Sequence, residues 1–464
     1  MWGETMMKTR LPSTAYSLIF FCFFATAKGQ VKPVDPGQTI HHKTPKVFVL
    51  KGATIVPEPG KVIESGEIVI RDGLIESIGK SAKIPADAFE VNLSGKTIYS
   101  GFIESYLERS DKKPPVTGRR SQQNQDEKTT TTATSHWNPK VKPDFSVLEQ
   151  YDFPEKEGKT LRSLGFTSAH LVPGSGIFRG QSALIHLGNW SPGSVIKEAG
   201  PVQAIGFEYG TWSDPTYPNS LLGAVALTRQ TFYDAKWYKE AWETYGRFPE
   251  TNDQPEEDRG LAALSTHLEN KGAILFMTDE ELGSLRAGKI GKEFDLNVWL
   301  KGNGYEYRRL NDIKALDSFV ILPINFPKAP DVSTWETALQ ITSEELRHWD
   351  MAPDNANKLA KAKIPFVLTT SELEDKKTFR NNLLKMIKRG FSKDEALASV
   401  TTTPAKRLGL SEVLGTLKKG KIANLVVTDG DYFDKKSRVE SVWIEGIKYP
   451  VITEPKADAR GTWT

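Results

Sequence analysis

The chain has 464 residues, which is enough for one large domain or two with a substantial core. Charged residues make up 26% of it and the formal net charge is +3, so the composition indicates no surface for nucleic acid or for an anionic membrane. The one cysteine, Cys22, lies in an N-terminal apolar run. If this run is cleaved as part of a signal peptide, the mature protein has no cysteine. We then expect no disulfide, catalytic thiolate or thiolate metal site in it.

Residues 1–27 have the pattern of a signal peptide. Lys8 and Arg10 precede an apolar run at 16–25 that is too short to span a bilayer, and Ala25-Thr26-Ala27 gives a small-x-small cleavage pattern. The sequence thus predicts an exported protein, periplasmic or extracellular, whose mature chain has no membrane span. Residues 28–45 are polar and contain prolines, which predicts a flexible leader.

Short strands are predicted next, between residues 46 and 99. Apolar residues alternate there, and turn sequences interrupt them at 57–60 (PEPG) and 71–73 (RDG). The following stretch, 110–135, contains almost no apolar residues. It is expected to be a disordered insertion, or simply a solvated surface loop.

From residue 148 onward, strand-like and helix-like segments alternate. This order favours parallel β-α-β units and approaches the count of a distorted (β/α)8 barrel. The predicted strands are 167–172, 202–207, 273–277, 296–300, 319–324 and 364–368. The predicted helices are 279–294, 343–363 and 376–388.

Two segments carry a family resemblance. Residues 100–108 (SGFIESYLE) resemble the metal-binding strand of the amidohydrolase superfamily, whose pattern is P-G-[FL]-[IV]-D-x-H-x-H, with Glu104 at the Asp. Residues 396–451 are similar to the ending of the same proteins, with T-x-x-P-A, then L-G, then G-K-x-A-N-L-V-V, where Asn424 stands for the usual Asp. The resemblance is to imidazolonepropionase-like metal-dependent hydrolases. It implies an α/β fold with a distorted (β/α)8 TIM barrel at 100–410 and a composite β-sandwich from 46–99 and 411–455.

The resemblance also implies where a metal site would be. The family has a His-x-His on the first barrel strand, a His on the fifth, a His on the sixth and an Asp on the eighth. The counterparts in this sequence are Tyr106, Glu108, Lys301, Leu322 and Ser371. This set lacks imidazoles and includes an ammonium that repels a divalent ion, so we expect no metal, although the family uses zinc or another divalent cation. A salt bridge between Glu108 and Lys301 is expected to cross-link the strands instead.

Other candidate groups are few. Of the seven histidines, only His170 and His186 lie near predicted strand ends, and their spacing does not indicate a metal site. The glycine-rich loop 173–182 contains Arg179 and Gln181. This loop either binds a carboxylate or phosphate, or is a tight turn that holds a structural arginine.

Three functions remain open on this reading. The first is an inactive pseudoenzyme that partners or regulates an active homologous amidohydrolase. The second is a hydrolase acting on carbon–nitrogen, non-peptide bonds by an atypical site, in which Lys301 would activate Ser371. The third is a small-ligand binding module without chemistry.

Overall fold

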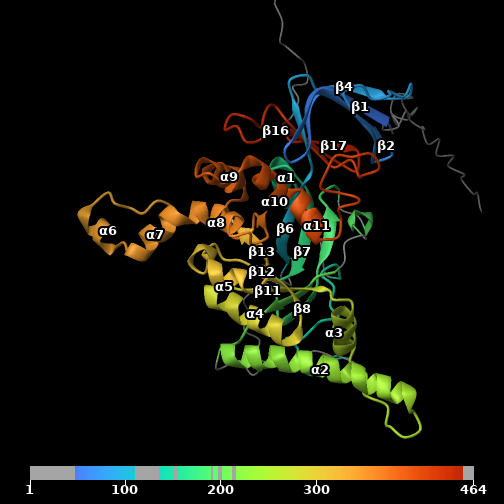
Figure 1. Ribbon diagram of the computed structural model, residues 1–464, viewed down its shortest axis with the longest axis vertical. Helices are drawn as coiled ribbons and strands as arrows, with labels where there is room; N and C mark the ends of the chain where they lie inside the picture. The colour runs from blue at the N-terminus through green and yellow to red at the C-terminus, as the bar shows by residue number, and fades with distance from the viewer. Residues whose placement is uncertain are drawn as a thin grey trace, which may run out of the picture. The chain divides into compact units, whose positions relative to one another are not determined.

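The computed structural model describes residues 47–109, 135–149, 154–189, 192–196, 201–211 and 216–452. The predicted signal peptide and leader lie outside these residues, as does all of the predicted insertion except Ser135. The described residues belong to one compact unit of mixed α/β structure (Figure 1). Within the described ranges, no helix combines the length and the apolar character needed to cross a membrane.

The N-terminal and C-terminal segments build one eight-stranded sheet. Its order is β17-β16-β15-β5-β1-β2-β3, with β4 also paired to β1, so β15 joins the C-terminal strands to the N-terminal ones through β5. The bounds are β1 Val47–Glu58, β2 Lys61–Arg71, β3 Leu74–Gly79, β4 Phe89–Asn92, β5 Thr97–Ser100, β15 Leu425–Thr428, β16 Val439–Ile444 and β17 Ile447–Pro450. The two segments thus share a single hydrogen-bonded sheet.

Alternation explains this sheet. Ile68 and Ile70 of β2 pack in one apolar cluster with Leu50 and Trp443, while Val69 between them packs in another. Gly66 allows the tight pairing of β1 with β2, because a Cβ there would lie 2.5 Å from Ile55 Cδ1.

The remaining strands form two further sheets. The six-stranded sheet has the order β14-β13-β12-β11-β10-β8, and its strands β10 to β14 are parallel. The three-stranded sheet has the order β6-β7-β9. The bounds are β6 Phe102–Arg109, β7 Phe166–Pro173, β8 Phe178–Gln181, β9 Ala183–His186, β10 Gln203–Gly206, β11 Ala273–Met277, β12 Asn297–Lys301, β13 Phe319–Pro323 and β14 Phe366–Thr369.

Among the described residues, these two sheets do not join into one closed hydrogen-bonded ring. At one junction, a side chain connects β6 to β14: the Thr369 hydroxyl shares its proton between Glu104 Oε1 and, at 3.2 Å, Tyr106 O. At the other, β9 returns antiparallel onto β7 and β8 lies antiparallel on β10. An antiparallel connection therefore occupies the edge where a closed barrel would have its next parallel strand.

The helices are α1 Glu155–Ser163, α2 Leu221–Arg247, α3 Arg259–Glu269, α4 Glu281–Phe294, α5 Leu310–Lys314, α6 Trp335–Gln340, α7 Ser343–Met351, α8 Asn355–Lys361, α9 Phe379–Lys388, α10 Lys393–Val400 and α11 Thr402–Arg407. The predicted helix 343–363 is divided into α7, a 3-10 turn at Ala352–Asp354 and α8, because Pro353 interrupts the helical hydrogen bonds. The long helix α2 was not predicted.

Strand alternation separates two faces of the parallel sheet. Trp299, Phe319, Ile321 and Val367 share a cluster with Tyr106, and we call this cluster the inner layer. The residues between them on the strands pack in other clusters, together with residues of the helices. The side chains at the C-terminal ends of these strands make up the candidate site.

Candidate functional site

Two of the predicted positions meet in the inner layer. Tyr106 on β6 and Lys301 at the end of β12 are both buried, and Lys301 Nζ lies 5.6 Å from the centroid of the Tyr106 ring. Lys301 pairs in register with Ile321 on one side and Met277 on the other, and both of these belong to the inner layer. The ammonium therefore lies at the inner face of the sheet, beside an aromatic ring.

Lys301 is ion-paired to Glu372, not to Glu108. Its Nζ contacts Glu372 Oε1 and also donates to Gly302 O at 3.0 Å. The other Glu372 oxygen accepts a hydrogen bond from Asn325 Nδ2 at 3.0 Å. The predicted Glu108–Lys301 salt bridge is thus wrong.

Glu108 is held on its own strand instead. The Tyr106 hydroxyl donates to Glu108 Oε2 at 2.6 Å, and Glu108 is exposed. Burial raises the pKa of the Tyr106 phenol, and the nearby Glu108 carboxylate raises it further. The phenol therefore stays protonated and acts as a hydrogen-bond donor.

Glu104, which stands for the Asp of the strand pattern, ties β6 to β14. It is fully buried and accepts hydrogen bonds from Thr370 N at 3.0 Å and Tyr106 N at 3.1 Å, and another from Thr369 Oγ1. Burial raises the pKa of its carboxyl, while the charge of Lys376 opposes that rise. Its contacts are those of a structural cross-link.

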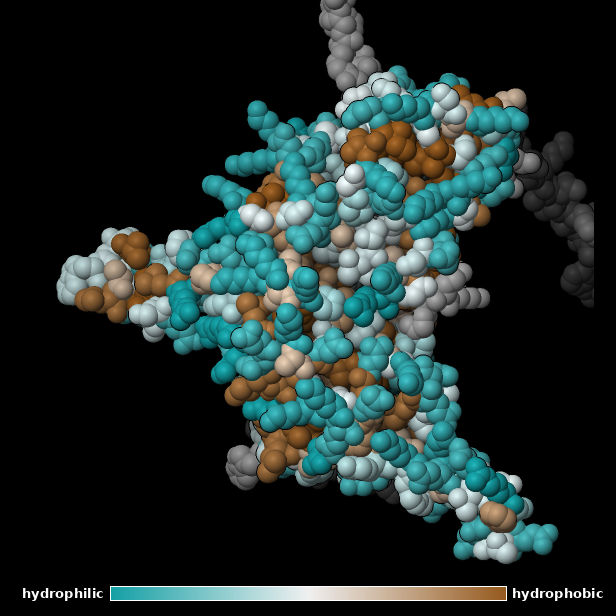
Figure 2. Space-filling model, viewed as in Figure 1, coloured by the Kyte–Doolittle hydropathy of each residue, from teal (hydrophilic) through white to brown (hydrophobic). Residues whose placement is uncertain are grey.

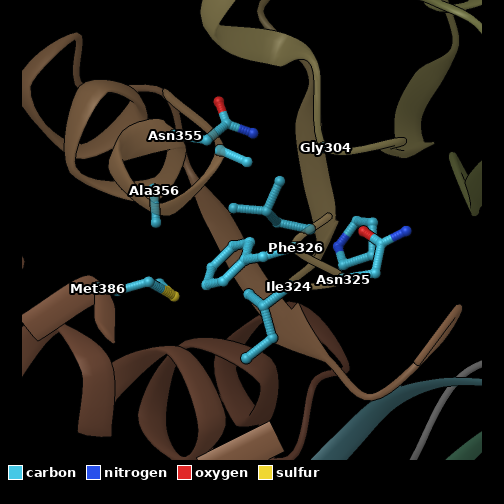
Figure 3. Close-up of a pocket in the computed structure, with 10 residues that line it drawn as sticks. Gly304, Ile324, Asn325, Phe326, Asn355, Ala356 and Met386 are labelled. Atoms are coloured by element: carbon cyan, nitrogen blue, oxygen red, sulfur yellow. The ribbon is translucent and has the colours of Figure 1, made fainter. Parts of the chain in front are cut away.

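Leu322 does not join the other positions. It packs on the opposite face of the sheet from the inner layer, in a cluster with Ile324 and Met386, next to a cavity of only about 10 Å³. In Figure 3, Ile324, Phe326, Ala356 and Met386 gather on one side, and the Asn325 amide lies away from Met386. The inward position on β13 is Ile321, one residue earlier. Counting along D-S-I-E-H-G from Asp317 also gives Ile321, so the placement at Leu322 was one residue too late.

Ser371 is half-buried, and its backbone N–H donates to Thr369 Oγ1 at 3.0 Å. Among the described residues, no hydrogen bond links its hydroxyl to Lys301. The Ser–Lys arrangement that an atypical hydrolase needs is therefore not formed. The sequence did not point to its neighbour Glu372, the ion-pair partner of Lys301, which has a φ of 63°, an uncommon value for a residue other than glycine.

Arg179 and Gln181 have structural roles in β8. Arg179 Nε donates to Gly176 O at 3.1 Å, and its guanidinium lies against Gly206, where a Cβ would be 2.5 Å from Nη2. Gln181 is fixed by its backbone, which donates to Phe145 O at 2.7 Å and accepts from Val147 N at 3.0 Å. These contacts favour the tight-turn interpretation. Burial raises the pKa of Tyr106, and the charge of Arg179 is close enough to oppose that rise.

The histidines at described positions do not supply a metal site. His170 is fully buried between Ser182 Oγ at 2.7 Å and Ser105 O at 3.0 Å, and burial lowers its pKa to about 4. His186 Nδ1 lies 3.2 Å from Asn424 Nδ2. Within the described ranges, no group of three or more His, Cys, Asp or Glu residues could hold a metal ion. The donor set at the inner layer, with its buried ammonium, does not fit a divalent cation.

Comparisons with known proteins support the fold. The family described as Amidohydrolase family matches residues 375–447. An amidohydrolase structure from Thermotoga maritima MSB8 is 22% identical with a TM-score of 0.66, over 86% of this chain and 99% of that chain. A second amidohydrolase is 14% identical with a TM-score of 0.50, over 88% and 100%. A prolidase complexed with N-methylphosphonate-L-proline is 16% identical with a TM-score of 0.49, over 87% and 99%. No curated protein matches.

Proposed function

We propose that this chain is an exported amidohydrolase-fold protein that has lost the family's metal chemistry and acts as an inactive partner of an active homologous amidohydrolase. The observation that carries this proposal is the buried Lys301 ammonium, paired with Glu372 where the resemblance places a metal-binding histidine. In this proposal the two inner sheets correspond to a distorted, incompletely hydrogen-bonded (β/α)8 barrel. The eight-stranded sheet corresponds to the composite domain.

Electrostatics supports the loss of metal binding. A divalent ion at this place would face a like charge a few ångströms away, with a repulsion of several kcal/mol at an effective dielectric constant of about 20. Glu372 is already neutralised by Lys301 and hydrogen-bonded by Asn325. Without a metal, nothing in this set lowers the pKa of water toward neutrality or polarises a scissile carbonyl.

Metal analysis tests the first half of the proposal. The mature chain is equilibrated with excess zinc or manganese, desalted and measured by mass spectrometry of the metal. We expect much less than about half an equivalent per chain, because ligands must be deprotonated and arranged around the ion for tight binding. A stoichiometry near one would overturn the proposal.

The partner role needs a second experiment. The chain is co-expressed with a homologous amidohydrolase from the same genome that retains the His-x-His strand, and the purified complex is assayed. We expect co-purification and a raised thermal midpoint for the active enzyme, since a ligand that binds only the native state stabilises it. If neither co-purification nor a shift is seen, the partner role is wrong even where the metal result agrees.

A further inference from the structure

The segment between β13 and β14 carries two helices that are stabilised locally. We call residues 331–351, which contain α6 and α7, the arm; it forms an extension in Figure 1. Neither helix has a buried residue. Each starts with a capping box, in which Thr334 bonds reciprocally with Thr337 and Thr342 with Glu345. These caps satisfy the first backbone N–H groups without tertiary packing.

The arm exposes large apolar side chains. Trp335 is 72% exposed and Leu339 is 76% exposed, and they lie four residues apart on one face of α6. Val332, Leu346 and Trp349 are also exposed. Figure 2 shows apolar residues on this extension among polar ones. Exposed clusters that include tryptophan are typical of protein interaction surfaces.

The base of the arm is fixed to the rest of the compact unit. The His348 ring stacks on Tyr305 at a centroid distance of 3.8 Å, and its Nδ1 lies 3.2 Å from the Tyr307 hydroxyl. Arg308 Nη1 pairs with Glu344 at 2.9 Å. These contacts position α7, and α6 lies only two residues before it in the chain. A short connection to a positioned helix reduces the entropy cost of binding through α6.

A groove elsewhere on the chain matches this face in size. The groove between α2, α3 and the end of α4 has a volume of about 250 Å³. Ala235, Leu268, Phe294 and Leu296 form its apolar lining. The volume lies below the range of roughly 300–1,000 Å³ that is usual for drug-sized ligands. It suits one or two large side chains.

The charges of the arm and the groove are complementary. The arm contains five acidic residues and one basic residue, Arg347, and two of the acidic residues, Glu344 and Asp350, are paired with Arg308 and Arg389. The other three acidic residues outnumber Arg347, so the arm is negative. The groove carries Lys236, Lys239 and Lys271 at its edge, with Glu269 and Asp295. Lys239 is paired with Glu269 at 2.7 Å, and Lys236 Nζ lies 5.0 Å from the centroid of the Phe294 ring. Lys236 and Lys271 form no salt bridge within the described part of the chain. Two acidic arms repel each other, whereas an arm and this groove attract.

We propose that the arm of one copy of this chain docks in the α2–α3 groove of a second copy, with Trp335 and Leu339 inserted and Glu336 beside the groove lysines. Such a contact joins two different surfaces. Each pair therefore retains one unused arm and one unused groove, and copies add to form a ring or an open chain. This self-association is independent of the proposed function, because it involves no residue of the inner layer.

Sedimentation velocity on the full mature chain tests the proposal. The arm variant is Trp335→Ala/Leu339→Ala and the groove variant is Lys236→Glu/Lys271→Glu. A matched control, Trp137→Ala/Leu222→Ala, removes the same residue types at positions that are 66% and 80% exposed. We expect the wild type and the control to sediment as assemblies that shrink with added salt, and both variants to sediment as monomers.

Mixing the two variants gives the decisive result. The groove variant retains an arm and the arm variant retains a groove, so an equimolar mixture should form dimers although each variant alone is monomeric. A mixture that stays monomeric, with both variants folded by circular dichroism, would overturn the proposal. A wild type that remains monomeric at about 100 µM, where a Kd near 10⁻⁴ M is detectable, would also overturn it. So would a groove variant that still dimerises, since that result indicates arm-to-arm contact.

Discussion

The ion pair between Lys301 and Glu372 is unequal in burial, and this inequality gives a quantitative prediction. The Lys301 side chain is 6% exposed and that of Glu372 is 39% exposed. The variant Glu372→Gln leaves a buried ammonium without a counter-charge, and its hydrogen-bond acceptors are then Gly302 O and the neutral amide oxygen of the new side chain. The variant Lys301→Met leaves a carboxylate that water and Asn325 can still solvate. Glu372→Gln should therefore be the more harmful of the two.

The expected magnitudes follow from two limits. Breaking a fully buried pair costs about 3–5 kcal/mol, because it strands an unpaired charge. An exposed pair contributes about 0–1 kcal/mol. We expect Glu372→Gln to lower the free energy of unfolding by about 2–3 kcal/mol. For Lys301→Met we expect a loss below about 1 kcal/mol, since solvent screens the exposed carboxylate and the methionine retains the apolar stem.

Urea unfolding at neutral pH measures both losses, with the double variant completing the cycle. A matched control is available two residues away, where Glu374 pairs with Lys328 at 2.9 Å and both side chains are more than 80% exposed (85% and 83%). Glu374→Gln should leave the free energy of unfolding nearly unchanged. If Lys301→Met costs as much as Glu372→Gln, the argument from unequal burial is refuted.

Two further predictions concern stability. Burial lowers the pKa of His170 to about 4. Between about pH 6.5 and pH 4 the unfolded chain therefore binds a proton that the folded chain does not. The free energy of unfolding should fall by up to about 3 kcal/mol as the pH drops through this range. His170→Gln should flatten this pH dependence in urea unfolding, and an unchanged slope would contradict the assignment. Gly180 has a φ of 108° and a Cβ there would lie 2.3 Å from Phe145 O, so Gly180→Ala should cost about 2 kcal/mol or more. Gly79→Ala, with nothing within 4 Å, is the control in a thermal melt, and equal losses would show that the close approach at Gly180 is not real.

The buried parallel strands were well predicted from sequence. The prediction for 273–277 has the same bounds as β11, and those for 296–300 and 319–324 differ from β12 and β13 by one residue. Such strands are short continuous apolar runs, so their pattern is local and strong. Which strands lie at the edges where the sheets meet could not be predicted in this way. Whether β9 returns onto β7 depends on pairing between distant edges, and a local pattern does not contain that information.

In the candidate site too, residues on regular strands could be predicted, whereas a loop residue could not. Tyr106 and Lys301, two of the positions that the resemblance selects, lie close together because regular strands fix both. Glu372 was missed because its position depends on a loop residue with positive φ just beyond β14, and no periodicity marks such a residue. Leu322 was misplaced by one residue, and in a strand a slip of one residue moves the side chain to the opposite face.

That slip leads to the last prediction, which concerns restoring metal ligands. Four substitutions are common to both test proteins: Tyr106→His, Glu108→His, Lys301→His and Ser371→Asp. The fifth is either Ile321→His, on the inner face, or Leu322→His, on the outer face. Imidazole and carboxylate ligands suit zinc-type ions when they converge, so the set with His at 321 should bind zinc more tightly than the four common substitutions alone.

The set with His at 322 should bind zinc no better than the four common substitutions and should be less stable, because it buries an imidazole beside Ile324 and Met386. Zinc titration followed by calorimetry compares the three proteins directly. Activity is not expected to return in either set, since the groups that would orient the new imidazoles have not been restored. Equal zinc affinity for the two five-fold sets would show that the faces of β13 are assigned wrongly. The inner layer would then no longer support the argument that this chain has lost a metal site.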